Sequence, residues 1–353
     1  MSGQSCRVLS PRMGPVSRIA FGTLTVSPMQ RNLPAEEAAA VMAYAFDAGI
    51  NFADTAQYYE NYGLIRLALK KARRGEEVMI SSKTYAWNRE LALEAVEEAR
   101  RGLDRDVIDV FMLHEQESFD TLRGHREALD TLFELRERGV IRAVGASTHH
   151  VALVRGLIRL AREEGVTVDV CHPLYNMAGI GIADGGEADM AAALAELKAL
   201  GVGIFGMKAL GGGHLSVSAE EALRFVLDKP FIDAAAVGMQ SFAEVDANLR
   251  LLTEGAFSSS DRERLVHADR RLRVEEYCEG CGACVRRCGE GALRLVPVAE
   301  EEVGHDLTAE FAAAEGVPRT EKGPRYRAEP DDAKCVRCGY CTRVCPVFAL
   351  KIY

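Results

Sequence analysis

From residue 18 to residue 252, short β-branched apolar runs alternate with longer segments whose apolar residues recur every three or four positions. The short runs have the length and composition of buried strands, and the longer segments have the period of amphipathic helices. Gly49, Gly102 and Gly139 stand where the first helices are expected to end. Eight strands are predicted, at residues 18–21, 50–53, 78–81, 107–113, 140–146, 166–171, 202–206 and 232–237.

This alternation predicts parallel strands that are joined by right-handed helical crossovers. Eight such units fit a closed (β/α)8 TIM barrel better than an open doubly wound sheet. The phosphate loops of open nucleotide-binding sheets, GxGxxG after the first strand or GxxxxGK followed by Ser or Thr, do not occur in the sequence. We therefore predict an α/β fold with a barrel at residues 1–270.

Polar side chains stand just after several predicted strands, where the active sites of such barrels lie. Asp54 and Tyr59 follow the second strand, Lys83 the third and His114 the fourth. A lysine cation near a phenol lowers the phenol pKa, and a carboxylate holds the lysine in place. Each residue alone could be an ordinary polar rim residue, but together they predict a proton-transfer site. Tyr58 is the rival phenol.

The run DTA with a tyrosine five residues after its aspartate, followed by SSK and LH, resembles the aldo/keto reductase family over residues 15–255. The resemblance implies that Tyr59 is the general acid, that Lys83 and Asp54 tune it, and that His114 positions a carbonyl. It also implies an oxidoreductase that transfers hydride between a nicotinamide cofactor, usually NADPH, and a small aldehyde or ketone.

The same resemblance implies a set of cofactor contacts: Ser147, Thr148, His172, Asn176, Met207, Gly238, Ser241, Glu244 and Asn248. Thr148, His172 and Met207 replace the asparagine, glutamine and stacking tyrosine that are usual in the family. The arginine that often holds the 2′-phosphate is not evident, and Gln240 stands nearby. Both NADP(H) and NAD(H) therefore remain candidate cofactors.

Further polar groups follow the fifth, sixth and seventh strands. The glycine-rich run GMKALGGGHL, with Lys208, can bind a phosphate through its backbone or can simply form a tight turn. His149 and His150 are expected to face solvent at a helix start. His172, at the expected barrel mouth, is the better candidate for substrate contact.

Eight of the ten cysteines fall in two runs, CEGCGACVRRC at 278–288 and CVRCGYCTRVC at 335–345. The spacing C-x2-C-x2-C-x3-C is that of bacterial ferredoxins, in which the fourth cysteine of each run binds the other cluster. It predicts two [4Fe–4S] clusters, one held by Cys278, Cys281, Cys284 and Cys345 and the other by Cys335, Cys338, Cys341 and Cys288. Zinc ligation, disulfides and ligation within each run are the alternatives.

Residues 271–353 are predicted to form a small ferredoxin-like α+β iron–sulfur domain with a partly irregular insertion at about 289–334. The long insertion weakens the prediction of crossed ligation, because a long linker allows each run to bind its own cluster. Cys6 and Cys171 lie outside both runs and are expected to be small buried residues.

Charge and composition narrow the function classes. A net charge of -9 argues against a nucleic-acid partner, which a basic patch would favour. No apolar run reaches the roughly 18 residues of a membrane span, and the first residues do not form a secretory signal. A cytoplasmic protein is expected, and in a reducing compartment clustered cysteines are more often metal ligands than disulfides.

Hydride transfer moves two electrons, whereas an iron–sulfur cubane accepts one. The favoured interpretation is an aldo/keto reductase whose clusters have an ancillary role or exchange electrons with an external redox partner protein. The alternative is an iron–sulfur electron-transfer protein in which the barrel is a binding module.

Overall fold

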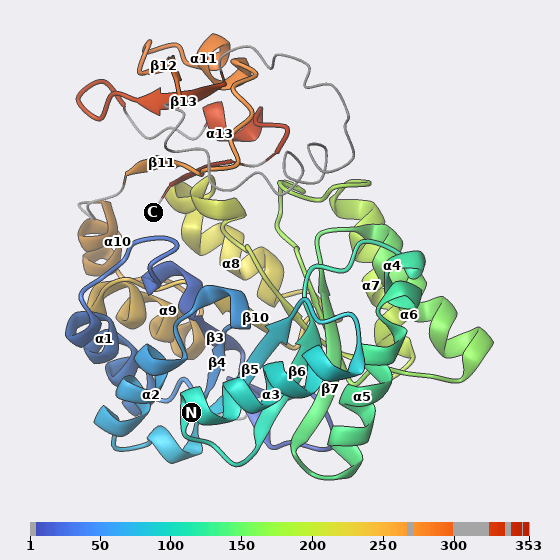
Figure 1. Cartoon of the computed structure of the whole chain (residues 1–353). Helices are drawn as coiled ribbons and strands as arrows, with labels where there is room; N and C mark the ends of the chain where they lie inside the picture. Colours follow the sequence, from blue (N-terminus) through green and yellow to red (C-terminus); the bar gives the residue numbers. More distant parts are fainter. Residues whose placement is uncertain (1–4, 267–270, 299–324, 336–339, 348, 353) are drawn as a thin grey trace. The chain divides into compact units, whose positions relative to one another are not determined.

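The computed structural model describes residues 5–266, 271–298, 325–335, 340–347 and 349–352. The chain forms two compact units, which are described separately below (Figure 1). The first comprises Met1–Gly211 and Leu215–Ala268, and the second comprises Gly212–His214 and Asp269–Tyr353.

The first unit contains a closed barrel of parallel strands, which confirms the predicted (β/α)8 fold (Figure 1). Its hydrogen-bonded order is β10-β3-β4-β5-β6-β7-β8-β9, so each strand pairs with its neighbours in sequence and the last closes on the first. The strands are β3 (Ile19–Gly22), β4 (Phe52–Asp54), β5 (Met79–Thr84), β6 (Ile108–Leu113), β7 (Ile141–Thr148), β8 (Val170–Pro173), β9 (Gly203–Gly206) and β10 (Ala234–Val237). The sixth strand lies further along the chain than the sequence predicted.

Helices surround this barrel and bury one face each against it. They are α1 (Ala35–Asp47), α2 (Tyr62–Lys71), α3 (Arg89–Leu103), α4 (Phe119–Gly124), α5 (Arg126–Glu137), α6 (Val151–Glu164), α7 (Glu187–Ala199), α8 (Ala219–Leu227), α9 (Phe242–Glu254) and α10 (Ser259–Val266). Local sequence explains several ends: Asn88 caps α3 through its side chain, and Gly165 ends α6 in a left-handed conformation (φ 67°).

A hairpin that the sequence analysis did not predict precedes the barrel. It consists of β1 (Cys6–Val8) and β2 (Pro15–Ser17), which pair antiparallel. Leu9, which lies in the turn between these two strands, belongs to the same buried cluster as Phe52 and Phe205 from the barrel strands. A Cβ added at Gly203 would lie 1.8 Å from the Leu9 carbonyl oxygen, so only glycine allows the turn to approach β9 this closely.

Polar side chains at the starts of alternate strands link the barrel strands in pairs. Each accepts a hydrogen bond from a backbone N–H in or beside the preceding strand: Asn51 from Ser17 (2.6 Å), Asp109 from Ile80 (2.8 Å), Asp169 from Val144 (2.8 Å) and Asp233 from Ile204 (2.8 Å). The three aspartates also pair with cations, namely Arg142, Arg136 and Lys198. This fourfold arrangement fixes the register at the end of the barrel opposite the strand C-termini.

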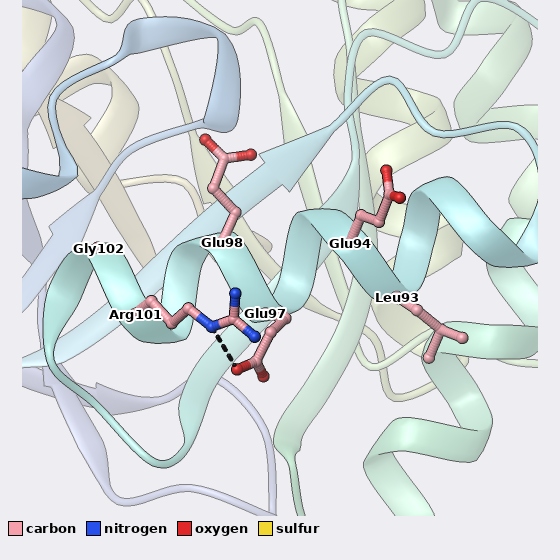
Figure 2. A pocket seen from close by; sticks show the side chains of 6 residues that line it. All are labelled: Leu93, Glu94, Glu97, Glu98, Arg101 and Gly102. Carbon is pink, nitrogen blue, oxygen red and sulfur yellow. Dashed lines mark hydrogen bonds and ion pairs between the residues drawn. The ribbon is translucent and has the colours of Figure 1, made fainter.

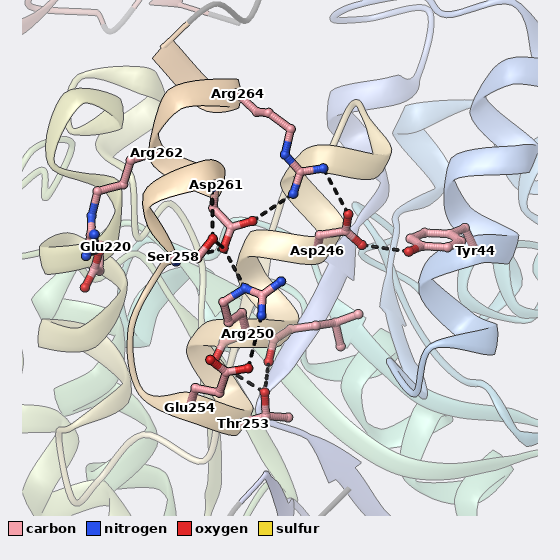
Figure 3. Close-up of polar contacts among 11 residues, drawn as sticks. Tyr44, Glu220, Asp246, Arg250, Thr253, Glu254, Ser258, Asp261, Arg262 and Arg264 are labelled. Atoms are coloured by element: carbon pink, nitrogen blue, oxygen red, sulfur yellow. Dashed lines mark hydrogen bonds and ion pairs between the residues drawn. The ribbon is translucent and has the colours of Figure 1, made fainter.

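The last helix of the first unit is held by a buried carboxylate (Figure 3). Asp261, which is fully buried, accepts hydrogen bonds from the Ser258 N–H (2.9 Å), Arg250 Nε (2.7 Å) and Arg264 Nη2 (2.8 Å). Burial raises the pKa of Asp261, but these bonds outweigh it and lower the pKa to about 2. The carboxylate therefore stays ionised and joins α9 to α10.

The second unit repeats a strand–cysteine run–strand pattern. Its elements are β11 (Leu272–Val274), α11 (Ala283–Arg287), β12 (Leu293–Pro297), β13 (Tyr326–Pro330), α13 (Tyr340–Arg343) and β14 (Leu350–Ile352). β11 pairs antiparallel with β14, and β12 with β13. The stretch 289–334, which the sequence analysis interpreted as an irregular insertion, thus includes a paired two-stranded sheet; residues 299–324 within it lie outside the described residues.

In the part of the chain that the structure describes, every helix is too short or too polar to cross a membrane.

We predict that Asp169→Ala lowers the free energy of unfolding of the first unit by about 1–3 kcal/mol, because the buried Val144 N–H loses its acceptor. Asp169→Asn keeps an oxygen acceptor but loses the charge that pairs with Arg136, so a smaller loss is expected. Urea unfolding measures both. Glu163→Ala is the control, since it removes only an exposed carboxylate. An Asp169→Ala effect no larger than that of Glu163→Ala would contradict the proposed linking role.

Candidate active site and cysteine cluster

The strand C-termini bring three of the four predicted catalytic residues to one end of the barrel. Asp54 is the last residue of β4, Lys83 lies near the end of β5, and His114 directly follows β6. β4, β5 and β6 are consecutive neighbours in the barrel, so their ends are adjacent. This is the end at which barrels of this type carry their chemistry.

Asp54 and Lys83 form a buried ion pair. The Lys83 ammonium donates to Asp54 Oδ1 (2.7 Å), Asp54 Oδ2 (2.9 Å) and the Thr55 carbonyl oxygen (2.6 Å). The two contacts to Asp54 can share one ammonium proton, because both oxygens of one carboxylate lie in nearly the same direction from Nζ. Ser81 donates a further bond to Asp54 Oδ1 (3.1 Å).

The pKa shifts of this pair reflect a competition between burial and pairing. Burial alone would raise the pKa of Asp54, but the charges of Lys83 and His172 and the hydrogen bonds from both together outweigh it and hold the pKa below its ordinary value. Burial also lowers the pKa of Lys83, and the attraction of Asp54 opposes that shift. We conclude that the two groups stabilise each other in their charged forms.

Tyr59 lies beside this pair. It belongs to a short 3-10 helix, Gln57–Tyr59, and its side chain is half-buried. The centroid of its ring lies 5.4 Å from the Lys83 ammonium. Burial, together with the charges of Asp54 and Glu115, raises the pKa of Tyr59 well above its ordinary value. The net shift is opposite to the lowering that the sequence predicted from Lys83, because burial dominates it. Tyr59 therefore holds its proton.

The neighbouring Tyr58 points elsewhere: it is 58% exposed, and its ring packs edge-on against Tyr85.

His114 is buried between two aromatic rings. Tyr59 meets it edge-to-face at 5.8 Å between ring centroids, and Tyr85 stacks on it at 4.5 Å. Tyr85 also donates a hydrogen bond to Glu115 (2.5 Å). Burial, followed by the Lys83 charge, lowers the pKa of His114 well below its ordinary value, so the imidazole is neutral at neutral pH. Its Nδ1 has no hydrogen-bond partner among the described residues.

The sequence analysis did not single out Tyr85 or Ser81 as functional residues. Both lie within a few positions of Lys83 in the run SSKTYAW, but nothing in the spacing indicates that one ring stacks on His114 or that one hydroxyl bonds to Asp54. Both contacts join neighbouring strands, and the sequence does not specify the register between those strands.

Four of the predicted cofactor residues lie at the ends of β7 and β8. The Ser147 hydroxyl accepts a bond from the Glu115 N–H (2.8 Å), and the Thr148 hydroxyl donates to the Gln116 carbonyl (2.6 Å). The Asn176 side chain bonds to the Ile180 N–H and carbonyl, so it shapes its own loop.

The fourth of these residues, His172, is 1% exposed. Its Nδ1 lies 2.6 Å from the Phe205 carbonyl oxygen, and its Nε2 lies 3.5 Å from Asp54 Oδ2. These contacts place His172 beside the Asp54–Lys83 pair.

The remaining predicted cofactor residues follow β9 and β10. Ser241 caps α9 by accepting a bond from the Glu244 N–H (3.3 Å), and Glu244 accepts one from the Gln240 N–H (2.6 Å). A Cβ at Gly238 would lie 2.8 Å from the Thr25 side chain, so glycine is needed there. Asn248 is buried in α9, and Met207, after β9, is half-buried. The start of α9 offers backbone N–H groups suited to an anionic phosphate.

His149 does not face solvent as the sequence analysis expected. It is half-buried, its Nε2 lies 3.1 Å from the Lys208 ammonium, and burial, with the Lys208 charge, lowers its pKa well below the ordinary value. His150 is also half-buried and precedes α6. In the glycine-rich run, Gly211 adopts a left-handed backbone (φ 57°), which accounts for glycine at this position.

A separate hollow lies on the outside of α3 (Figure 2). Glu94, Glu97 and Glu98 line it, but Glu97 is paired with Arg101 (2.9 Å) and Glu98 accepts a bond from Gln57 (2.6 Å). These are ordinary surface interactions, and we assign no site there.

Four thiols from both cysteine runs line one cavity of the second unit: Cys278, Cys281, Cys284 and Cys345. This set is the one that crossed ferredoxin ligation predicts for the first cluster. Burial, followed by the neighbouring thiols, raises the pKa of Cys284. The nine described cysteines are all free of disulfides. No group of three or more His, Cys, Asp or Glu residues in the described part is arranged to hold a single metal ion.

The fourth cysteines of the two runs have matching surroundings. Cys288 Sγ accepts a hydrogen bond from the Ala292 N–H (3.3 Å), and Cys345 Sγ accepts one from the Ala349 N–H (3.2 Å). Cys335 and Cys341 lie in the same buried cluster as Cys288. Cys338 lies outside the described residues, so the second predicted ligand set is described only in part.

Comparison with known proteins gives one family match for the barrel and another for the cysteine-rich unit. Residues 18–221 match the model of the aldo/keto reductase family, and residues 277–349 match that of a 4Fe-4S dicluster domain. The chain is 30% identical, over 42% of its length and 54% of the relative's, to 2,5-diketo-D-gluconic acid reductase B of a Corynebacterium species. It spans about half the length of several curated reductases, this one included.

Two solved structures show the same fold. A holo aldo-keto reductase from Bacillus halodurans superposes with a TM-score of 0.60 at 19% identity, covering 74% of this chain and 95% of that one. A Bombyx mori aldo-keto reductase in complex with NADP gives 0.57 at 15%, covering 74% and 91%. With a family match over more than half of its length, the chain belongs to the aldo/keto reductase family of oxidoreductases and carries a 4Fe-4S dicluster ferredoxin domain.

Proposed function

We propose that this protein is an NAD(P)H-dependent carbonyl reductase that carries two [4Fe–4S] clusters, with the catalytic barrel at residues 1–270 and the iron–sulfur domain at 271–353. The observation that carries the proposal is the buried Lys83–Asp54 pair beside Tyr59 and His114 at the strand ends. A neutral imidazole, a protonated phenol and a fixed cation form a site that can bind and protonate a carbonyl oxygen.

In this site Tyr59 donates its proton to the carbonyl oxygen of a small aldehyde or ketone, and neutral His114 orients that oxygen through a hydrogen bond. Lys83, held by Asp54 and the Thr55 carbonyl oxygen, stabilises the resulting phenolate through its positive charge. Asp54 keeps that charge in place. The bound reduced nicotinamide supplies the hydride.

The residues that would hold the cofactor fall into two groups. Ser147, Thr148 and Asn176 at the ends of β7 and β8 would contact the carboxamide, and Met207 would pack against the ring. His172 also belongs to the predicted set, but its two ring nitrogens lie against the Phe205 carbonyl oxygen and Asp54. Gly238, Ser241, Glu244 and Asn248 at the start of α9 form the adenosine and phosphate side. The capped N-terminus of a 13-residue helix and the glycine packed on Thr25 fit such a group. The amide of Gln240 bonds to Thr25, so a neutral group lies near the adenosine side, and both NADP(H) and NAD(H) fit.

The two clusters imply a partner as well. Each cubane accepts one electron, so exchange with an external redox protein is the simplest use of the second unit. Free cysteines and iron–sulfur ligation favour a reducing, cytoplasmic setting.

We predict that Tyr59→Phe lowers turnover with 4-nitrobenzaldehyde and other aldehydes by at least about 100-fold, because the general acid is lost. Binding of NADPH, followed by its fluorescence, should be nearly unchanged. Tyr58→Phe is the matched control, since that ring is exposed and packs on Tyr85, and it should retain most of the activity. Undiminished turnover in Tyr59→Phe would remove Tyr59 from the mechanism.

Crossed ligation makes two double variants behave in opposite ways. Cys281→Ala with Cys345→Ala disrupts one cluster, so about half of the iron and sulfide should remain; Cys281→Ala with Cys288→Ala disrupts both, so little should remain. Iron and acid-labile sulfide per chain measure the difference. Cys6→Ala, outside both runs, should keep the full content. The reverse order of the two double variants would show ligation within each run.

A further inference from the structure

His172 is placed differently from the cofactor contact that the sequence analysis expected. It lies in β8, its ring stacks on Phe205 at 3.9 Å between centroids, and its two nitrogens face different acceptors. Nδ1 lies 2.6 Å from the Phe205 carbonyl oxygen, and Nε2 lies 3.5 Å from the Asp54 carboxylate. Both neighbours can only accept hydrogen bonds.

These contacts fix where the protons must be. A carbonyl oxygen at 2.6 Å requires a proton on Nδ1. A flipped ring would put a carbon atom at that distance, which is too close. With Nδ1 protonated, a neutral ring leaves Nε2 without a proton, so its lone pair and the Asp54 carboxylate 3.5 Å away repel each other. A second proton, on Nε2, turns this repulsion into an attraction between opposite charges.

We propose that His172 is a positioning residue of the catalytic site, one that binds a proton against Asp54 and thereby sets the charge beneath Tyr59. The inference rests on the proposed function and extends it. When Nε2 is protonated, the group formed by Lys83, Asp54 and His172 carries one net positive charge in place of zero. A positive charge in a buried site stabilises the phenolate of Tyr59 and makes Tyr59 a stronger acid.

The charged groups around His172 act in opposite directions on its protonation. Burial lowers the pKa of His172, and Asp54 opposes that effect while Lys83 adds to it. The other titratable groups whose charges couple to His172, or that lie next to such a group, include His114, His149, Lys208 and Glu115. His114, His149 and Lys208 disfavour a further positive charge when they are protonated, whereas Glu115, 3.7 Å from His149 Nε2, favours one. Asp54 is the carboxylate that lies against His172 itself.

The first test is the pH profile of aldehyde reduction. As pH rises through the lowered pKa of His172, below about 6.5, kcat/KM in the wild-type protein should fall by about three- to tenfold, because the uncharged group no longer stabilises the phenolate. His172→Gln should lack this limb of the profile. Glutamine is the family's usual residue at this position, so this variant is expected to fold. His149→Gln is the matched control and should keep the limb; loss of the limb in His149→Gln, or its retention in His172→Gln, would overturn the proposal.

A second test needs neither substrate nor turnover. In protein with ¹⁵N-labelled histidine, the signal that disappears in His172→Gln should show a protonated Nδ1 throughout the titration. Asp54→Asn should lower the pKa of that signal by about one pH unit or more, because the opposing carboxylate charge is removed. A bare Nδ1 at high pH, or an unchanged pKa in Asp54→Asn, would refute the coupling. If no aldehyde is reduced, the proposed function fails while this titration still decides whether His172 binds a proton against Asp54.

Discussion

A lysine and an aspartate buried together at the end of two neighbouring strands impose the main constraint on this barrel. Neither charge is tolerated in the interior alone, and breaking such a pair typically costs several kcal/mol. The Lys83 ammonium reaches the Asp54 carboxylate and the Thr55 carbonyl oxygen only if β4 and β5 keep their register, in which Asp54 lies opposite Ser81. The links at the opposite end of the barrel, such as Asp109 to the Ile80 N–H, hold that register. The fold and the chemistry thus depend on the same alignment.

The environment that stabilises the pair makes Tyr59 a weaker acid. Burial and the charge of Asp54 raise the pKa of Tyr59, although a general acid works best with a pKa near the working pH. Lys83 cannot correct this alone, because Asp54 neutralises it. Under the proposed function, an extra positive charge near Asp54 would make Tyr59 a stronger acid, and the imidazole of His172 lies 3.5 Å from that carboxylate.

The sequence predicts the barrel well, and it places the proposed catalytic residues Asp54, Lys83 and His114 at neighbouring strand ends, because both follow from local patterns. Strand and helix periods define eight units, and the residue after each strand must lie at one end of a closed barrel. What it misses depends on neighbours that are distant in sequence. β8 ends at Pro173, so His172 lies within a strand and its side chain meets Asp54, whereas a strand that ended at residue 171 would have placed it in a loop at the mouth. The stack of Tyr85 on His114, and the paired strands within 289–334, likewise require the fold to be known.

In the second unit, the fourth cysteines of the two runs have matching hydrogen bonds. The fourth cysteine of each run, Cys288 and Cys345, accepts a backbone N–H bond from the residue four positions later. Hydrogen bonds to ligand sulfurs are among the factors that set the reduction potential of a cluster. Under the proposed function, two clusters that are tuned alike by these bonds could each hold one electron at a similar potential. Together they would hold two electrons, which is the number that one hydride carries, so the internal repeat of this unit matches the electron count of the barrel's chemistry.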